Sequence, residues 1–257
     1  NINYPLKDLR YLKTYTIDET QTVEVDDAIS LERISDCFKL WIHIASPSLY
    51  IDYDSLVDRN ARKLISSVYL STRNIYMFPE ILIEKLFSLS KNNVRASLSL
   101  GVIINNDGTI SFNEIVQSLI KVNYKLSYED ADELIDYAPR EEEDLSIISR
   151  LLEKRNCYRK NNGAKEILES YGKLVVNDNI PSIKIIDQSL SRLLISEAMI
   201  LFGELISNYT RVNNIPVPYR VQETKSIDNE KINCEPGNEI LNNYLLKRRM
   251  GKSYYTT

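Results

Sequence analysis

The sequence predicts an α+β fold, in which a mixed, mainly antiparallel sheet forms the core and helices surround it. Residues 95–104 alternate apolar and polar side chains, and the Asn-Asn-Asp-Gly turn signal at residues 105–108 returns the chain through 109–118 as an antiparallel partner. Residues 38–45 are a short, largely apolar run, which is typical of a buried strand. Residues 189–209 are rich in apolar side chains and long enough for a helix of several turns.

Shorter patterns predict the remaining elements. Pro79 suits the first turn of a short helix, and Ser127 can cap the amide of Asp130 at the start of another. In chain order we expect an extended segment at 23–26, a helix at 54–65, an irregular or extended segment at 66–78, helices at 79–87, 127–137 and 141–161, strands at 174–176 and 183–186 around a turn at 177–179, and an extended segment at 219–222. Because no repeat or linker divides the sequence, we interpret residues 1–257 as one domain.

Composition restricts the class of protein. Hydrophobic residues make up 43% and charged residues 26%, an ordinary globular mixture. The net charge of −4 argues against a broad basic surface for duplex DNA, so no DNA partner is expected. No apolar run reaches the ~18–20 residues of a membrane span, and no membrane partner is expected. The sequence starts without a secretory signal, and Cys37, Cys157 and Cys234 are scattered, which indicates reduced cysteines in a cytoplasmic protein.

Four acidic residues lie close together near the N-terminus. They are Asp18, Glu24, Asp26 and Asp27, with few basic residues nearby. Carboxylate oxygen is the ligand that hard divalent cations prefer, and crowded carboxylates repel one another unless a cation offsets their charge. In an extended chain Glu24 and Asp26 point to one side and Asp27 to the other, so a bulge or turn is needed to bring them together.

Two other interpretations of this cluster stay open on spacing alone. The first is a solvated acidic surface, which is what acidic clusters usually are. The second is a calcium-binding loop, which is less favoured because the expected central glycine and terminal glutamate spacing are missing.

Further motifs follow in a fixed order along the chain. They are Asp8-Leu9-Arg10-Tyr11-Leu12, Thr16-Ile17-Asp18, Glu24-Val25-Asp26-Asp27-Ala28, Trp41-Ile42-His43-Ile44-Ala45, Asp58-Arg59-Asn60-Ala61-Arg62, Ser67-Val68-Tyr69-Leu70, Ile75-Tyr76-Met77-Phe78-Pro79, residues 191–199 and Tyr219-Arg220-Val221. In this order they resemble the catalytic RNB domain of the ribonuclease II and ribonuclease R family. The resemblance covers nearly the whole chain and implies an RNB-like fold.

The resemblance implies a 3′→5′ exoribonuclease that hydrolyses single-stranded RNA to 5′ nucleoside monophosphates by a two-metal mechanism. Three metal-site aspartates of the family match, by position, Asp18, Asp26 and Asp27. Glu24 stands at the position of the fourth metal-site residue, where the family usually has aspartate. The implied cofactor is Mg²⁺, with Mn²⁺ as an alternative. Tyr69 matches a tyrosine that stacks on RNA bases, and Arg73 lies near enough in sequence to meet a phosphate.

The sequence also departs from the family. Glu24 adds a methylene at a ligand position, Ser46 replaces a frequent aspartate, and Tyr76 replaces a proline. The family's C-terminal segment with a phosphate-binding arginine has no match here, nor do flanking oligonucleotide-binding barrels. We therefore expect a domain truncated at its C-terminus, weakly active in isolation, and completed by the missing segment or a partner chain.

Each secondary candidate has a structural alternative. Tyr69 can be an ordinary packed tyrosine and Arg73 a solvated arginine, and His43 between two isoleucines is expected to be a hydrogen-bonded core histidine. The basic groups Lys154-Arg155, Arg159-Lys160 and Lys247-Arg248-Arg249 can line an RNA channel or form solvated helix faces. For the whole domain, the alternatives to an exoribonuclease are a non-hydrolytic RNA-binding module with a degraded active site, and a scaffold whose carboxylates are spread in solvent.

Overall fold

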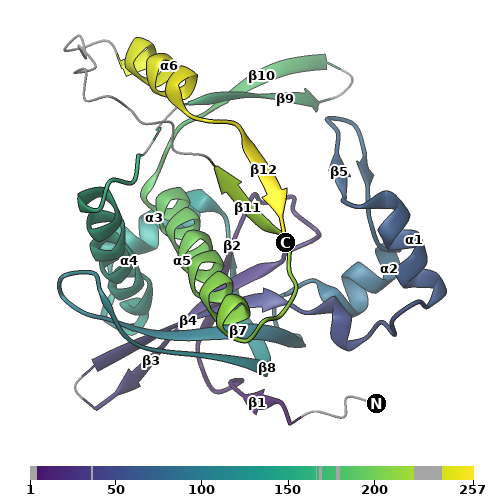
Figure 1. Ribbon diagram of the computed structural model, residues 1–257, viewed down its shortest axis with the longest axis horizontal. Helices are drawn as coiled ribbons and strands as arrows, with labels where there is room; N and C mark the ends of the chain where they lie inside the picture. The colour runs from purple at the N-terminus through teal and green to yellow at the C-terminus, as the bar shows by residue number, and fades with distance from the viewer. Residues whose placement is uncertain (1–4, 36, 166, 168–169, 178–179, 223–238) are drawn as a thin grey trace.

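A six-stranded mixed sheet forms the centre of the computed structural model, which describes residues 5–35, 37–165, 167, 170–177, 180–222 and 239–257 (Figure 1). Its strand order is β1-β8-β2-β3-β4-β7. In addition β7 pairs with β8, so the strands β8, β2, β3, β4 and β7 form a closed ring of neighbours. The strands are β1 (Lys7–Asp8), β2 (Thr14–Ile17), β3 (Asp27–Ile34), β4 (Cys37–Ala45), β7 (Val94–Ile104) and β8 (Ile110–Leu126). Only β8 pairs in parallel, with β1 and β2, so the predicted mixed, mainly antiparallel α+β fold is confirmed.

The strand β8 is longer than the predicted 109–118. Its first part pairs with β7 in the expected hairpin, from Ile110 to Lys121, and its last residues continue beside β2. The short strand β2 alternates two threonines with Tyr15 and Ile17, but all four residues are buried and the strand is too short for this alternation to predict it. The sequence pattern therefore identified neither β2 nor the part of β8 that pairs with it.

The β7–β8 turn forms as predicted. The Gly108 amide donates to the Asn105 carbonyl at 3.0 Å, and Gly108 has a φ of +83°, a left-handed conformation that favours glycine. A Cβ at this position would lie 2.4 Å from the Lys154 carbonyl oxygen, so the turn also needs glycine to pack against the neighbouring helix.

Serine side chains cap the starts of two main helices, and the cap at Ser127 was predicted. Ser127 caps α3 (Tyr128–Tyr137) in a reciprocal capping box with Asp130, and Ser189 caps the amide of Arg192 in α5 (Leu190–Val212). The other helices are α1 (Leu56–Leu64), α2 (Glu80–Leu82) followed by a π-helical turn (Ile83–Phe87), α4 (Asp144–Asn161) and α6 (Glu239–Arg249), with 3-10 turns at Pro47–Leu49 and Arg140–Glu142.

Three two-stranded sheets accompany the main sheet. They pair β5 (Val68–Tyr69) with β6 (Asn74–Ile75), β9 (Tyr171–Asn177) with β10 (Ile180–Ile186), and β11 (Tyr219–Gln222) with β12 (Ser253–Thr256). We did not predict α6 or β12, and part of the predicted 177–179 turn lies outside the described residues.

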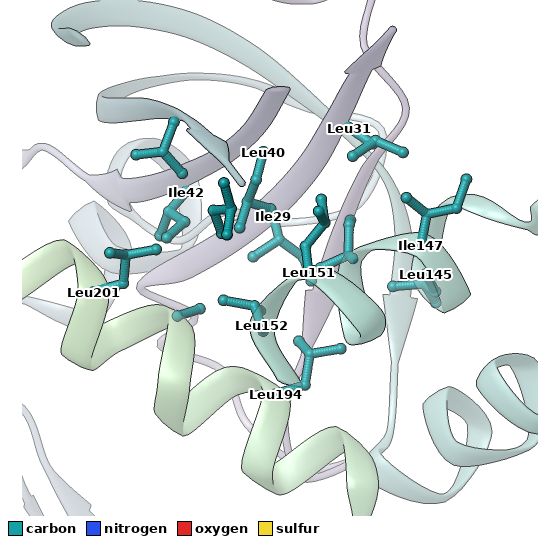
Figure 2. Packing of buried hydrophobic residues seen from close by; sticks show 14 of the residues in the cluster. Ile29, Leu31, Leu40, Ile42, Leu145, Ile147, Leu151, Leu152, Leu194 and Leu201 are labelled. Atoms are coloured by element: carbon teal, nitrogen blue, oxygen red, sulfur yellow. The ribbon is translucent and has the colours of Figure 1, made fainter. Parts of the chain in front are cut away.

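Helices α4 and α5 cover one face of the sheet and bury the main core between them (Figure 2). Figure 2 shows Ile29 and Ile42 of the sheet facing Leu152 of α4 and the α5 residues Leu194 and Leu201. Burial of each such side chain contributes roughly 1.5–3 kcal/mol. This core fixes β3 and β4, and therefore fixes the ends of these strands where the acidic residues lie.

The predicted role of His43 as a hydrogen-bonded core residue is confirmed. His43 is fully buried, and its two ring nitrogens lie 2.8 Å from Ser30 Oγ and 2.7 Å from Ser99 Oγ. Burial lowers the pKa of His43 to about 3, so the ring is neutral at physiological pH.

In the part of the chain that the structure describes, no helix is both long and apolar enough to cross a membrane. Cys37 and Cys157 are free thiols, while Cys234 lies outside the described residues. The cytoplasmic location stays a prediction.

Candidate active site

The acidic residues lie at one end of the sheet, where β2 stops and β3 begins. Asp18 directly follows β2, and Asp27 is the first residue of β3, which pairs antiparallel with β2. Glu24 and Asp26 lie in the segment that joins these strands. The Asp26 carbonyl accepts a 2.7 Å hydrogen bond from the Ala45 amide at the end of β4, which holds this segment against the sheet. The expected change of direction near Asp26 and Asp27 is thus provided by a loop entering a strand.

The carboxylates are close enough to perturb one another. Burial, together with the charges of Glu24 and Asp18, raises the pKa of Asp26 to about 6. Burial also raises the pKa of Asp27 to about 6, with contributions from Asp18 and Asp26. Repulsion among these four carboxylates is therefore a property of the site and would be relieved by a cation.

The donor set fits a hard divalent cation in charge and chemistry. Asp27 Oδ2 is buried and has no hydrogen-bond partner, which is costly for a carboxylate oxygen unless a ligand binds it. The nearby Arg192 does not neutralise the cluster directly, since its guanidinium donates to Glu19 at 2.8 Å. Within the described ranges, however, no group of three or more Asp, Glu, His or Cys side chains has the spacing to hold a metal ion. The four carboxylates are neighbours rather than a preformed ligand shell, and their role as ligands stays a prediction.

Glu24 is held by the β5–β6 hairpin. Its Oε2 atom accepts hydrogen bonds from the Tyr69 hydroxyl at 2.5 Å and from Ser67 Oγ at 2.8 Å. Burial and the hydrogen bond to Glu24 raise the pKa of Tyr69. Tyr69 therefore lies beside Glu24, and its hydroxyl contacts this side chain, for which the sequence predicted only a role as a metal ligand. The stacking of Tyr69 on RNA stays a prediction.

A cavity of about 660 Å³ adjoins the cluster. Asp18 and Glu24 contribute to its acidic side, Tyr69 and Asn74 belong to the β5–β6 hairpin, and Lys173 comes from β9. Lys173 was not among the predicted site residues, because nothing in the sequence places the β9–β10 hairpin near the acidic loop.

Other predicted residues lie elsewhere. Arg73 is not in the lining of this cavity, nor are Asp26 and Asp27. Arg155 and Arg159 of α4 pair with Glu204 and Glu197 of α5 at 2.6 and 2.7 Å, so they connect two helices of the core. These arginines have a structural explanation that does not need RNA.

Sequence reasoning also missed the role of Arg192 and Tyr128. The Arg192 guanidinium lies 3.9 Å from the centre of the Tyr128 ring, next to its ion pair with Glu19. Burial and the charge of Asp18 raise the pKa of Tyr128 to about 12. The cap at Ser127 and the apolar content of residues 189–209 predicted the two helices, but only the packing of α3 against α5 brings these two residues together beside Asp18.

Comparisons with known proteins agree with this fold. The RNB domain family matches residues 6–246. An uncharacterised ribonuclease of Synechocystis is 36% identical over 234 residues, covering 90% of this chain and 35% of its own length. The chloroplastic/mitochondrial ribonuclease II of Arabidopsis thaliana is 37% identical over 228 residues, covering 86% of this chain and 28% of its own length. This chain thus spans about a third of the curated relatives it matches.

Solved structures share the fold. RNase R of Mycoplasma genitalium, in complex with ribose-methylated single-stranded RNA, superimposes with a TM-score of 0.88 at 22% identity, covering 98% of this chain and 45% of that one. Yeast Ssd1, described as a pseudonuclease, has a TM-score of 0.75 at 17% identity, covering 99% of this chain and 35% of its own.

The family match and the shared fold therefore define an RNB domain. This chain belongs to the RNB domain family, whose members with similar sequences are named ribonuclease II and ribonuclease R.

Proposed function

We propose that this protein is a metal-dependent 3′→5′ exoribonuclease that hydrolyses single-stranded RNA to 5′ nucleoside monophosphates. Membership of the RNB domain family and the ribonucleases among its relatives support a ribonuclease. The neighbouring residues Asp26 and Asp27 support the dependence on a metal ion. Their pKa values are raised to about 6, and the buried Oδ2 atom of Asp27 has no hydrogen-bond partner.

Asp18, Asp26, Asp27 and Glu24 would hold Mg²⁺ or Mn²⁺. Two such ions, when bound, lower the pKa of a water molecule and stabilise the oxygen that leaves the phosphodiester. Asp26 and Asp27 need to be ionised for this role, which requires either a pH above about 6 or a cation that lowers their pKa. The Tyr69 ring, which is 58% exposed, supplies a stacking surface beside the cluster.

The chain has no other obvious base for this reaction. Its one histidine, His43, is fully buried and bonded to two serines. This burial argues against a histidine-based nuclease mechanism and supports a catalytic role for the carboxylates.

A titration of RNA cleavage with Mg²⁺ and Mn²⁺ tests this function. A 5′-labelled single-stranded RNA should shorten from its 3′ end, release 5′ mononucleotides, and stop doing so when the metal is chelated. Cleavage in the presence of excess chelator, or products that arise from cleavage at internal positions of the strand, would refute the proposal.

A non-hydrolytic RNA-binding module is the second candidate. It is favoured by the lack of a preformed three-ligand group in the described part of the chain and by the fold shared with yeast Ssd1, a pseudonuclease. For this candidate, RNA should bind with the same affinity with and without divalent cation, and no mononucleotide should appear at any metal concentration.

A further inference from the structure

Glu24 makes contacts that a metal ligand alone does not need. Both of its side-chain hydrogen bonds, from Tyr69 and Ser67, end on Oε2, and the described residues give Oε1 no hydrogen bond. One carboxylate oxygen is thus committed to the β5–β6 hairpin, while the other remains available to a cation or to solvent.

The β5–β6 hairpin depends on such anchors. Each of its strands has two residues, and the side chains of Val68 and Ile75 are 45% and 40% exposed, so they contribute little burial. A two-stranded hairpin without a packed face is marginally stable in water. Ser67 also accepts a 3.0 Å hydrogen bond from the Met77 amide, so Ser67 joins the two ends of the hairpin to Glu24.

The hairpin forms one wall of the cavity beside the acidic residues. Tyr69, Leu70, Ser71 and Asn74 line this wall, and β9 lines another through Lys173 and its two neighbours. The position of the hairpin therefore determines how wide the cavity is where a strand of RNA would approach Asp18.

We propose that Glu24 is a positioning residue, whose Oε2 atom clasps the β5–β6 hairpin through Tyr69 and Ser67 and so sets the width of the substrate cavity. The length of the side chain matters for this role. Aspartate at position 24 would be shorter by roughly 1–1.5 Å, too short to keep the 2.5 Å and 2.8 Å contacts with the backbone in place. The clasp makes a hydroxyl of the predicted stacking tyrosine part of the active-site architecture.

Hydrogen–deuterium exchange of the metal-free protein tests the clasp without reference to activity. Hydrogen bonds to a charged group contribute enough that losing one should speed local exchange about tenfold. Tyr69→Phe, Ser67→Ala and Glu24→Asp should each accelerate exchange in residues 67–77 by about this factor. Tyr76→Phe is the matched control, since the Tyr76 hydroxyl belongs to the same hairpin but accepts from Asn74 at 3.1 Å and does not contact Glu24.

Equal exchange rates in wild type, Tyr69→Phe and Ser67→Ala would overturn the clasp. Tyr69→Phe keeps the ring and removes one oxygen atom, so it is expected to fold. Ser67→Ala removes the other hydrogen bond to Glu24 Oε2 and tests the same attachment independently.

The consequence for RNA rests on the proposed function. Tyr69→Phe should weaken binding of a single-stranded RNA several-fold and raise KM more than it lowers kcat, because the ring is retained but the wall is loosened; Tyr76→Phe should change neither. Unchanged RNA affinity in Tyr69→Phe, with faster hairpin exchange, would refute the cavity-width part of the proposal. Wild-type protein that does not bind RNA would refute the proposed function, whereas the exchange rates judge the clasp by themselves.

Discussion

The stability of the Asp27→Asn variant, measured relative to that of the wild type, should increase as the pH rises. Burial and neighbouring carboxylates raise the pKa of Asp27 from 3.8 to about 6 in the folded state. The folded protein therefore binds this proton more tightly than the unfolded chain, and wild type loses stability as the pH rises from about 4 to about 6. A pKa change of this size corresponds to about 3 kcal/mol. The asparagine side chain cannot ionise, so the variant avoids that loss.

The assay is urea unfolding of wild type and Asp27→Asn in chelator at pH 4 and pH 7.5. Any fixed cost of burying the amide is the same at both pH values and cancels in the comparison. The free energy of unfolding of the variant relative to wild type should increase by about 2.4 kcal/mol from the lower to the higher pH, because the unfolded carboxyl is already partly ionised at pH 4. Asp107→Asn is the control, because hydrogen bonds from Thr109 lower the pKa of this turn residue. Between the two pH values, the unfolding free energy of Asp107→Asn relative to wild type should change little, and in the opposite direction. A difference for Asp27→Asn that does not depend on pH would refute the electrostatic description of the site.

Three further outcomes are expected. Mg²⁺ at a hundred times its Kd should stabilise the wild type by about 2.7 kcal/mol, which raises its Tm by several degrees. A double Asp26→Asn, Asp27→Asn variant should show no such shift. An equal shift in both proteins would mean that the ion binds elsewhere. Arg159→Ala leaves Glu197, which is 3% exposed, without its strongest partner and should cost about 3–5 kcal/mol in urea unfolding, whereas replacing both residues by apolar ones should recover much of the loss. Gly108→Ala should cost at least ~1–2 kcal/mol because of its positive φ, plus the effect of the close Lys154 carbonyl; an unchanged urea midpoint would show that the turn relaxes freely.

Local sequence signals predicted much of the fold. The Asn-Asn-Asp-Gly turn, the cap at Ser127 and the apolar run of β4 each depend on neighbours within a few residues, and each is confirmed. The strand β2 was missed for a physical reason. All four of its residues are buried, it lies between β3 and β8 in the sheet, and its parallel partner lies more than 100 residues away in the sequence. The alternation of two threonines with Tyr15 and Ile17 is too short to reveal this pairing.

The candidate site was predicted only in part. The acidic motif and its resemblance to the RNB domain identified Asp18, Glu24, Asp26 and Asp27, and the structure places these residues as electrostatic neighbours. The bond between Glu24 and Tyr69 joins residues 45 positions apart, and Lys173 reaches the cavity from a separate hairpin. Such contacts arise from the packing of distant segments, which composition and spacing do not encode.

Release of mononucleotides by the protein with Asp26 and Asp27 both changed to alanine is the most direct measurement of the central claim. Single-turnover rates on a single-stranded RNA, in saturating Mg²⁺ and alongside the wild type, should fall by at least a hundredfold, while RNA binding measured in chelator is retained. Undiminished mononucleotide release from this double variant would show that hydrolysis does not depend on a cation held by these carboxylates.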